Sequence, residues 1–318
     1  MIGNKYNVRN LIRAIRDPKL FANEIKSLFR QARSRAFETR HGPAFDIMDA
    51  DWDVLILLDA CRYDYFERTI DLEGELKPIV SPGAHSWEFM RNAFVGNKFH
   101  DTVYVTANPH AQKLDKDIFY TIENILDAWN SEIGTVPPEE VVKTALEAND
   151  KFPNKRLIIH FMQPHEPHMG PTAEKIRERV ELTGWDKHHG NPEKKVDLDG
   201  VHTWQAVKDG TVSIEEVRRS YSESLEIVID HASDLIDGID GRTVISSDHG
   251  EMLGERGVIQ RRFGHPHDIY CPELRVIPWF ISPSDTRRTV EPEKPIGFDR
   301  FDDETVNNRL VSLGYKPE

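Results

Sequence analysis

Two short apolar runs, each ending at an aspartate, place the strongest constraint on the fold of this chain. Residues 54–58 read VLILL and lead directly to Asp59, and residues 244–247 read VISS and lead to Asp248. A continuous apolar run is typical of a strand in a parallel sheet, because helices bury both faces of such a strand. The sequence therefore predicts two buried strands that each deliver an acid at the carboxyl end.

Strands and helices are expected to alternate along most of the remaining chain. Further strand-like runs lie at 102–106, 156–162 and 274–281, and helical patterns lie at 120–129, 138–148, 214–235 and 306–313. Residues 171–212 are polar and lack strong periodicity, which indicates an inserted lid or simply a flexible surface. We expect a basic helical segment at 1–45, a main domain at 46–290 and a tail at 291–318.

The residues at the two strand ends are suited to holding a metal ion. Ligands of open α/β sheets bind at the carboxyl ends of the strands, and Asp59, Asp248 and His249 offer carboxylate oxygens and an imidazole nitrogen there. A simpler interpretation of residues 248–250 is a surface turn, since Asp, His and Gly all favour turns. Asp59 could likewise cap a helix that starts near Tyr63.

Ser86 is the candidate nucleophile. The turn-forming residues 81–85 precede a helix-like run, so Ser86 is expected at a helix N-terminus, where free N–H groups favour an anionic oxygen or an incoming phosphate. The alternative is a plain N-cap serine, a role that Ser81 could also fill. Cys61 is a second possible nucleophile, although a cysteine at a strand end is more often simply buried.

Histidines gather in two other loops. Pro164 and Pro167 stiffen a loop that displays His165 and His168 beyond the 156–162 strand, and a second pair precedes the 274–281 strand, at His265 and His267. Isolated histidines are usually structural, but pairs of them past strand ends indicate a site.

Composition and charge limit the kinds of partner and the cellular compartment that we expect for this chain. The chain has 318 residues and a net charge of −13, and residues 41–318 carry 31 Lys/Arg against 51 Asp/Glu, which argues against nucleic acid. No apolar run is long enough to span a membrane, and no secretory h-region opens the chain. Only Cys61 and Cys271 are present, which favours a reducing compartment. We therefore expect a cytoplasmic location, with the option of peripheral contact with a membrane.

The basic N-terminus is the candidate for that contact. Residues 1–40 carry ten Lys/Arg against three Asp/Glu, and apolar residues follow helical spacing through residues 5–37. Asp17-Pro18 suits the start of a helix. Such a helix could lie on an anionic membrane. The alternative is a helix docked on the main domain or on a partner, since most amphipathic helices face protein.

Taken in order, these motifs resemble the alkaline phosphatase/sulfatase superfamily. The likeness covers about residues 50–285 and is carried by the strand that ends at Asp59, the hydroxyl of Ser86, His165 in its loop, Ser-Asp-His-Gly at 247–250, and Gly-His at 264–265 before Arg-Val-Ile-Pro at 275–278. Order and spacing are similar to sulfatases, lipoteichoic-acid synthases and phosphoethanolamine transferases. The resemblance implies a doubly wound, mostly parallel α/β sheet with helices on both faces.

The resemblance also implies roles for individual residues. The main divalent metal would be bound by Asp59, Ser86, Asp248 and His249. Ser86 would form a covalent phosphoryl- or sulfuryl-enzyme. The substrate anion or a second metal would be contacted by His165 and His265, with His168 and His267 as further candidates. Arg62 is a weaker catalytic candidate, with a salt-bridge partner as its simpler role.

Two departures from sulfatases affect the prediction. Sulfatases make their nucleophile within Cys/Ser-x-Pro-x-Arg, and neither Cys61 nor Ser86 stands in that pattern. Ala60 stands where many sulfatases carry a second metal-binding Asp, and the less oxygen-rich site favours zinc or manganese over calcium or magnesium. Both points favour phosphate chemistry at an unmodified Ser86.

We therefore expect a metal-dependent hydrolase or transferase that acts on phosphate or sulfate esters through Ser86. Its substrate would be a small molecule or a glycan- or lipid-linked ester. One alternative is a sulfatase that acts on a glycan. Another is a non-catalytic binding protein with the same fold, since a fold does not guarantee activity.

Overall fold

The computed structural model describes residues 18–180, 203–257, 261–266 and 269–313 of the chain. The chain divides into two compact units, Met1–Ala44 and Phe45–Glu318. The first unit contains α2 (Pro18–His41), which begins at the proline predicted to open it. Gly42 follows with a φ of 92°, the left-handed conformation in which glycine commonly ends a helix. No helix in the described ranges is long and apolar enough to cross a bilayer.

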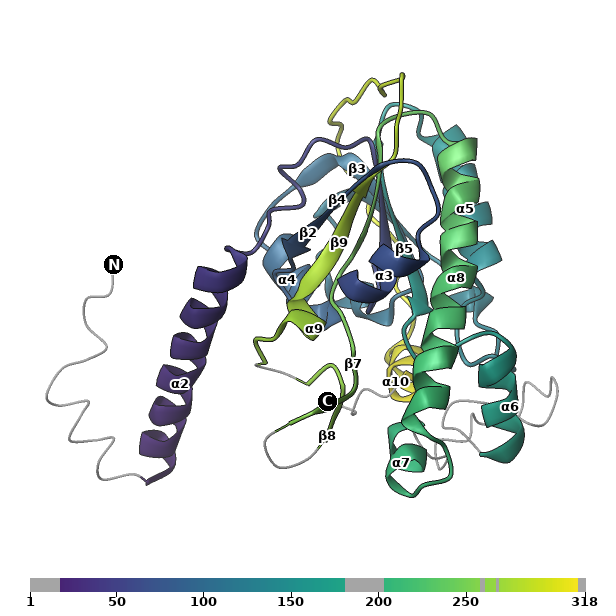
Figure 1. Ribbon diagram of the computed structural model, residues 1–318. Helices are drawn as coiled ribbons and strands as arrows, with labels where there is room; N and C mark the ends of the chain where they lie inside the picture. The colour runs from purple at the N-terminus through teal and green to yellow at the C-terminus, as the bar shows by residue number, and fades with distance from the viewer. Residues whose placement is uncertain (1–17, 181–202, 258–260, 267–268, 314–318) are drawn as a thin grey trace, which may run out of the picture. The chain divides into compact units, whose positions relative to one another are not determined.

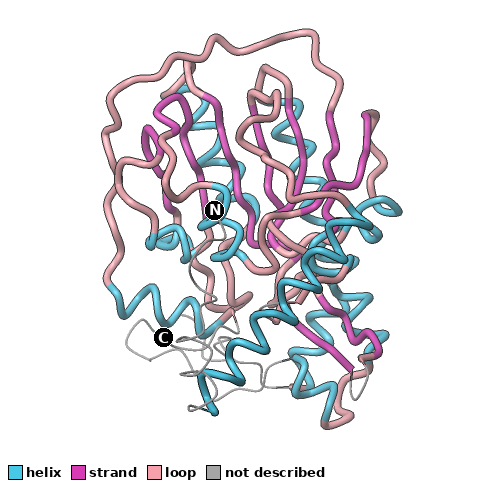
Figure 2. The backbone as a smooth tube through the Cα atoms, turned by 90° about the vertical axis from the view of Figure 1, so that its left-hand side faces the viewer, coloured by secondary structure: helices cyan, strands magenta, loops and turns pink. Residues whose placement is uncertain are grey.

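The second unit is built on a seven-stranded mixed sheet of order β2-β9-β6-β1-β5-β3-β4 (Figures 1 and 2). Its strands are β1 (Val54–Asp59), β2 (Glu75–Val80), β3 (Phe99–Thr106), β4 (Phe119–Asn124), β5 (Arg156–Pro164), β6 (Thr243–Ser247) and β9 (Val276–Ile281). Neighbouring strands from β6 to β4 run parallel, whereas β9 is antiparallel to both β6 and β2. The predicted mostly parallel α/β sheet is confirmed.

Helices cover both faces of this sheet. The helices of the domain are α3 (Tyr63–Thr69), α4 (Ser86–Ala93), α5 (Pro138–Lys151), α6 (Pro171–Arg179), α7 (Thr203–Lys208), α8 (Ile214–Gly238), α9 (Pro272–Arg275) and α10 (Asp303–Ser312), with short 3₁₀ turns η1 (Pro109–Lys113) and η2 (Leu126–Ala128). In Figure 1, α5 and α8 lie on one side of the sheet and α4 lies on the other.

The packing of strand β1 explains why residues 54–58 are all apolar. Alternate side chains of a strand point to opposite faces. Val54, Ile56 and Leu58 join the core cluster beneath α5 and α8. Leu55 and Leu57 join the separate cluster that contains residues of α4. Every residue of β1 is buried, as expected for a central strand of a doubly covered sheet.

The helix expected at residues 120–129 is wrong. Those residues form most of β4 and the η2 turn. Phe119, Thr121 and Ile122 are buried, and their β-branched and aromatic side chains suit a strand that pairs with β3. The expected strand at 274–281 is also shorter than predicted, because α9 takes its first residues. Strand β2 and the hairpin of β7 (Met252–Arg256) and β8 (Arg261–Gly264) were not predicted.

The expected lid and tail segments both contain ordered structure. Helices α6 and α7 share a small apolar cluster with α8, while residues 181–202 lie outside the described ranges. After β9, the chain donates hydrogen bonds from Glu291 N to Asn154 O and from Ile296 N to Tyr120 O. These contacts tie residues 291–313 to the sheet domain. A lid function for residues 171–212 stays a prediction.

Candidate active site

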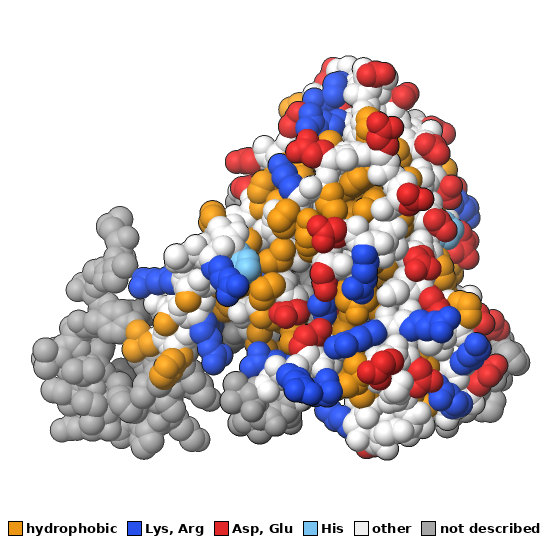
Figure 3. All heavy atoms as spheres, viewed as in Figure 1, with side chains coloured by type: hydrophobic (Ala, Val, Ile, Leu, Met, Phe, Trp, Pro, Cys, Tyr) orange, Lys and Arg blue, Asp and Glu red, His pale blue; other side chains and the backbone are white. Residues whose placement is uncertain are grey.

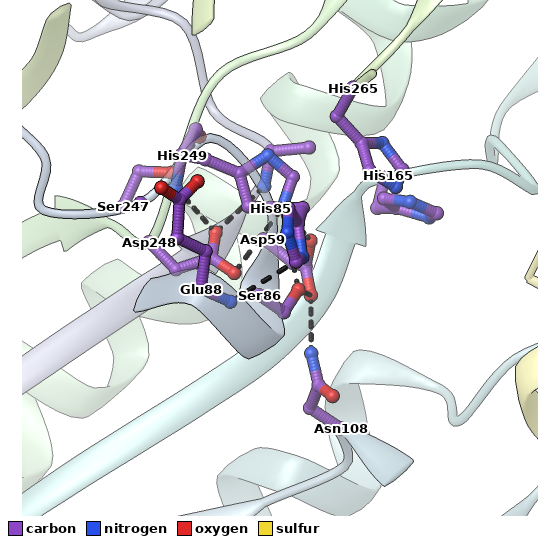
Figure 4. A network of polar contacts seen from close by, with 12 residues as sticks. Asp59, His85, Ser86, Glu88, Asn108, His165, Ser247, Asp248, His249 and His265 are labelled. Carbon is purple, nitrogen blue, oxygen red and sulfur yellow. Dashed lines mark hydrogen bonds and ion pairs between the residues drawn. The ribbon is translucent and has the colours of Figure 1, made fainter. Parts of the chain in front are cut away.

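Asp59, Asp248 and His249 come together at the carboxyl ends of neighbouring strands. Leu58 of β1 pairs with Ser247 of β6, so the residues that follow them leave the sheet side by side. Their ligand atoms all lie within 4.8 Å of one another, and the three side chains are fully buried. Figure 4 shows them converging from the two strand ends. The geometry expected of a shared metal site is therefore present.

Backbone groups fix the orientation of the Asp248–His249 pair. Ala60 N and His249 N donate to Asp248 Oδ1, at 3.1 and 2.8 Å. His249 Nδ1 donates to the Gly250 carbonyl at 2.8 Å. This bond places the ring proton on Nδ1 and leaves Nε2 as the acceptor, which is the arrangement that a metal-binding histidine requires. His249 Nε2 lies 3.5 Å from Asp59 Oδ1 and 3.4 Å from Asp248 Oδ2.

Ser86 faces the same cluster from helix α4, which covers one face of the sheet. It is the first residue of α4, and its Oγ lies 3.3 Å from both Asp59 Oδ2 and His249 Nε2. The N-cap is His85, whose Nδ1 accepts from Glu88 N at 3.4 Å. Ser86 is therefore not the capping residue, and its hydroxyl points at the ligand cluster instead (Figure 4).

The cluster buries two carboxyl groups beside each other. Asp59 Oδ1 and Asp248 Oδ2 are buried and accept no hydrogen bond from any described residue. Burial, together with the neighbouring Asp248, raises the pKa of Asp59 well above its usual value. Burial lowers the pKa of His249 well below its usual value, so this ring is neutral. Buried acids without cationic partners are costly, so these residues fit a divalent cation.

Two residues that the sequence did not single out support this cluster. Asn108, just after β3, donates from Nδ2 to Asp59 Oδ2 at 2.8 Å. His160 lies within β5, with Nε2 3.7 Å from an oxygen of Asp59 and of Asp248 and Nδ1 2.7 Å from the Tyr104 hydroxyl. The strand-end position of Asn108 was a usable signal. The position of His160 inside an apolar strand gave none.

A second group of ligand-type atoms adjoins the first. His165, Glu251 and His265 have ligand atoms within 4.8 Å of one another. His265 Nδ1 lies 3.2 Å from Glu251 Oε2, and the His265 ring centroid lies 5.0 Å from those of His165 and His249. Burial raises the pKa of Glu251 to about 8 and lowers that of His165. Glu251 was missed as a site residue, although it directly follows the Asp-His-Gly motif.

Arg62 forms salt bridges with two acidic residues. Its guanidinium pairs with Asp64 at 2.8 Å and with Glu255 at 2.5 Å, and it donates to the Glu251 carbonyl at 3.2 Å. These contacts favour the salt-bridge interpretation of Arg62, and its catalytic role stays a prediction.

His168 also belongs to the framework of the domain. Its Nδ1 lies 2.7 Å from Ser220 Oγ, and its backbone carbonyl accepts from Arg177 at 2.8 Å. Burial lowers the pKa of His168 to about 3. We therefore no longer place His168 in a second site. His267 lies outside the described residues.

Cys61 does not offer a competing nucleophile. Its side chain is fully buried, with Sγ 3.8 Å from the Arg62 carbonyl. Burial raises the pKa of the thiol well above its usual value, which opposes formation of the reactive thiolate. Ser86 is therefore the better placed of the two candidates.

Comparison with known proteins gives matches only among solved structures. No protein family profile and no curated protein sequence matches this chain. The C-terminal periplasmic domain of phosphoethanolamine transferase EptC from Campylobacter jejuni is 13% identical, with coverage of 73% of this chain and 78% of that chain and a TM-score of 0.45. The corresponding domain from Escherichia coli in complex with Zn is 13% identical, with coverage of 76% and 77% and a TM-score of 0.42.

One of the matching structures contains a sulfated substrate. BT4656, in complex with its substrate D-glucosamine-2-N-6-O-disulfate, is 11% identical, with coverage of 83% of this chain and 76% of that chain and a TM-score of 0.42. Other matching structures carry the word sulfatase in their titles. These are the kinds of protein that the motif resemblance named. Because the two EptC domains and BT4656 are only 11% to 13% identical to this chain, the roles of individual residues rest on this chain's own geometry.

The cytoplasmic location expected from the cysteine content is contradicted by these matches. The transferase structures are periplasmic domains by their titles. Cys61 and Cys271 are both free, and a lack of disulfides shows only that the fold does not need them. The cytoplasmic expectation is therefore withdrawn.

Proposed function

We propose that this chain is a metal-dependent enzyme that cleaves or transfers phosphate esters through a covalent intermediate on Ser86. The observation that carries the proposal is the convergence of Asp59, Asp248, His249 and Ser86 in one buried cluster. The hydroxyl of Ser86, at the start of a helix, faces carboxylate and imidazole side chains that come from the ends of two strands. A structural role for this group would leave its buried acids without compensation.

The proposed cation site uses Asp59, Asp248, His249 and the Ser86 oxygen. One imidazole nitrogen among carboxylate and hydroxyl oxygens suits zinc or manganese better than calcium, which prefers more oxygen ligands. A bound divalent cation would lower the pKa of the serine hydroxyl and offset negative charge on the transferring group. Asn108 would hold Asp59 in its ligating orientation through the 2.8 Å hydrogen bond.

The first chemical step forms a bond from Ser86 Oγ to phosphorus and breaks the bond from phosphorus to the ester oxygen. Asp59 Oδ2 and His249 Nε2, each 3.3 Å from Oγ, are the acceptors within reach of the serine proton in the structure. The leaving alkoxide takes a proton and departs as an alcohol. His165, Glu251 and His265 are placed beside the cluster, and Glu251, with its pKa of about 8, holds a proton at neutral pH.

The second step decides between hydrolase and transferase. Water or an acceptor alcohol attacks the phosphoryl group, the Ser86–phosphorus bond breaks, and the serine oxygen regains its proton. The same neighbouring group can contact the transferring anion through N–H groups of His165 and His265 or hold a second cation through their unprotonated ring nitrogens. These residues serve both outcomes, so the identity of the acceptor depends on groups farther from Ser86.

Phosphate is preferred to sulfate because no modified nucleophile is available. Cys61 is buried with its Sγ beside the Arg62 carbonyl, and neither Cys61 nor Ser86 stands in the sequence pattern that sulfatases convert. An unmodified serine suits phosphoryl transfer.

The test is an assay panel on the metal-loaded protein. After mild purification, metal content is measured by mass spectrometry, and turnover is followed with an aryl phosphate, an aryl phosphodiester and an aryl sulfate. We expect about one tightly held zinc or manganese per chain and turnover of a phosphate substrate. Turnover of the sulfate alone would indicate the glycan sulfatase alternative, and metal binding without turnover of any ester would indicate a binding protein.

Ser86→Ala is the decisive variant in that panel. It should lower turnover by several orders of magnitude, as removal of a covalent nucleophile does, and leave folding and metal content nearly unchanged. Cys61→Ser is the matched control and should have a mild effect, because Cys61 is not among the candidate ligands and its thiol is fully buried. Near-normal turnover by Ser86→Ala, combined with loss in Cys61→Ser, would contradict both the nucleophile and the preference for phosphate.

We also propose that α2 brings the enzyme to a lipid-linked substrate at an anionic membrane. Leu28 and Phe29 are 48% and 67% exposed. Arg30, Arg33 and Arg35 are exposed on the same helix, whose basic and apolar side chains are interspersed (Figure 3). Apolar side chains beside cationic ones suit the interface of an anionic bilayer.

A further inference from the structure

The geometry points to Glu88 and Arg275 as positioning residues that hold Ser86 against the ligand cluster. This inference rests on the proposed function, because it assigns the pair to the placement of the nucleophile. Neither residue belongs to the two groups of candidate ligands, and the Arg-Val-Ile-Pro motif that begins at Arg275 gave it no role of its own. Their effect would be exerted through helix α4 and through the turn that carries Asp248.

The first contact joins the two side chains. Arg275 Nη2 lies 2.9 Å from both carboxylate oxygens of Glu88. The side chains of Arg275 and Glu88 are only 5% and 16% exposed. Glu88 Oε2 also accepts from Ala84 N at 2.8 Å. The Glu88 carboxylate therefore links Arg275 to the chain on both sides of Ser86.

The second set of contacts joins α9 to the turn after β6. Gly250 N donates to the Leu274 carbonyl at 2.9 Å. A Cβ at Gly250 would lie 2.1 Å from the Glu273 carbonyl oxygen, so only glycine allows this approach. The Asp248–Gly250 turn is thus packed directly on the helix that ends with Arg275.

A third set of contacts joins α9 and the Asp248 backbone to the segment that leads into α4. Ser81 N donates to the Arg275 carbonyl at 2.8 Å, and the Ser81 hydroxyl donates to the Asp248 carbonyl. Arg275 therefore contacts the Ser86 helix through its side chain and the preceding segment through its backbone. The single turn of α9 sets the position of the nucleophile relative to the Asp248–His249 pair.

We expect the Glu88–Arg275 ion pair to position Ser86 rather than to stabilise the fold. A largely buried ion pair is weak grounds for stability, because desolvation offsets most of the attraction. The same pair fixes direction well, since the guanidinium and the carboxylate are both planar and hydrogen-bonded. Helix α4 is only eight residues long. A displacement of about 1 Å at a reacting group can cost on the order of a hundredfold in rate.

The test combines kinetics with crystal structures of variants in the full-length, metal-loaded protein. Arg275→Met removes the guanidinium and keeps an apolar stem, whereas Glu88→Gln keeps an acceptor for Ala84 N and removes the charge. Arg275→Lys restores the charge. The matched control is Arg156→Met, because Arg156 pairs with Asp101 at 3.3 Å and opens β5 at the end opposite the site.

Arg275→Met and Glu88→Gln should each lower kcat at least about tenfold and leave KM within about twofold, because substrate groups are untouched. The double variant should be no slower than the slower single variant, as expected when both act through one contact. Arg275→Lys should recover part of kcat, and Arg156→Met should match the wild type. In the Arg275→Met crystal structure, Ser86 Oγ should lie beyond hydrogen-bond distance of Asp59 and His249.

The inference is overturned if Ser86 Oγ keeps its position in the Arg275→Met crystal structure, or if the losses in the two single variants multiply in the double variant. A rise in KM at constant kcat would also overturn it. A wild-type protein that turns over no ester would refute the proposed function instead. In that case the position of Ser86 in the variant structures still decides the positioning inference.

Discussion

Asn108 would orient one ligand of the proposed cation site from outside the ligand cluster. Its side-chain amide donates to Asp59 Oδ2, while its Oδ1 accepts from His110 N at 2.9 Å. The second bond fixes the direction of the amide, so the first one orients the carboxylate. Groups that orient a ligand are commonly worth about 10- to 100-fold in metal affinity.

Asn108→Ala should therefore weaken zinc binding by about 10- to 100-fold without removing any ligand. The measurement is a competition titration of the metal-free protein with a chromophoric chelator. Asn92→Ala is a suitable control, because it removes an exposed side-chain amide that donates to the Pro82 carbonyl and not to a candidate ligand. Equal zinc affinity in the wild type and in Asn108→Ala would exclude this orienting role.

Glu251 predicts a pH dependence of stability in the metal-free protein. Burial raises its folded-state pKa from 4.5 to about 8. Between these two values the folded chain holds a proton that the unfolded chain has released. The free energy of unfolding should therefore fall as pH rises from about 4.5 through about 8, by up to a few kcal/mol.

Glu251→Gln should remove that contribution, because an amide does not titrate. Urea denaturation of both proteins in chelator, at several values of pH between about 5 and about 8.5, measures the difference. The wild type should lose stability relative to the variant as pH rises. The gap between the two should stay constant with pH if the carboxyl of Glu251 is already ionised at the acidic end of that range.

At the scale of elements, helix α2 belongs to a compact unit of its own. It carries Lys and Arg over most of its length and only two glutamates, Glu24 and Glu38. This charge is opposite to that of the acidic remainder of the chain. A helix with this composition is suited to anionic lipid, where each basic residue contributes about 1 kcal/mol near the surface.

Removal of residues 1–40 should abolish co-sedimentation with vesicles that contain anionic lipid, while aryl-ester turnover is retained. Leu28→Asp combined with Phe29→Asp should weaken sedimentation without a deletion, because both side chains are exposed. Vesicles of neutral lipid are the control. If the deletion instead unfolds the protein, the helix packs on the domain and the membrane proposal fails.

At the scale of the whole molecule, the proposed cation joins elements that are distant in the sequence. Asp59 ends β1, Asp248 and His249 follow β6, and Ser86 opens α4. A cation bound to all of them links both layers of the domain through its central strands. Binding to the folded state alone stabilises it by about 4 kcal/mol at a free concentration about a thousand times the Kd.

Chelation should therefore lower the Tm of the wild type, and added zinc or manganese should restore it. Thermal unfolding with and without chelator measures the shift. Asp248→Asn should show a much smaller response to metal than the wild type, because it lacks one of the charged ligands. A wild-type Tm that does not change with chelator or metal would contradict a structural contribution from this site.

The sequence alone determined the parts of this protein that depend on local pattern. Apolar runs ending at Asp59 and Asp248 predicted buried parallel strands, and the carboxyl ends of such strands meet at one edge of a sheet. The proposed ligands Asp59, Asp248 and His249 followed from that rule, whereas Ser86 followed from its expected position at a helix N-terminus. The edge strand β4 was misassigned, because a half-buried segment with mixed polarity has no unique periodicity.

Only the tertiary structure decided which neighbouring side chains join the site. His160 lies inside a strand and Glu251 follows the motif, yet both side chains turn toward the ligand groups. His168 and Arg62 stand beside the motifs, yet Ser220 and Glu255 hold them elsewhere. The direction in which a side chain points depends on contacts with residues that are distant in the chain. A local sequence pattern does not identify those residues.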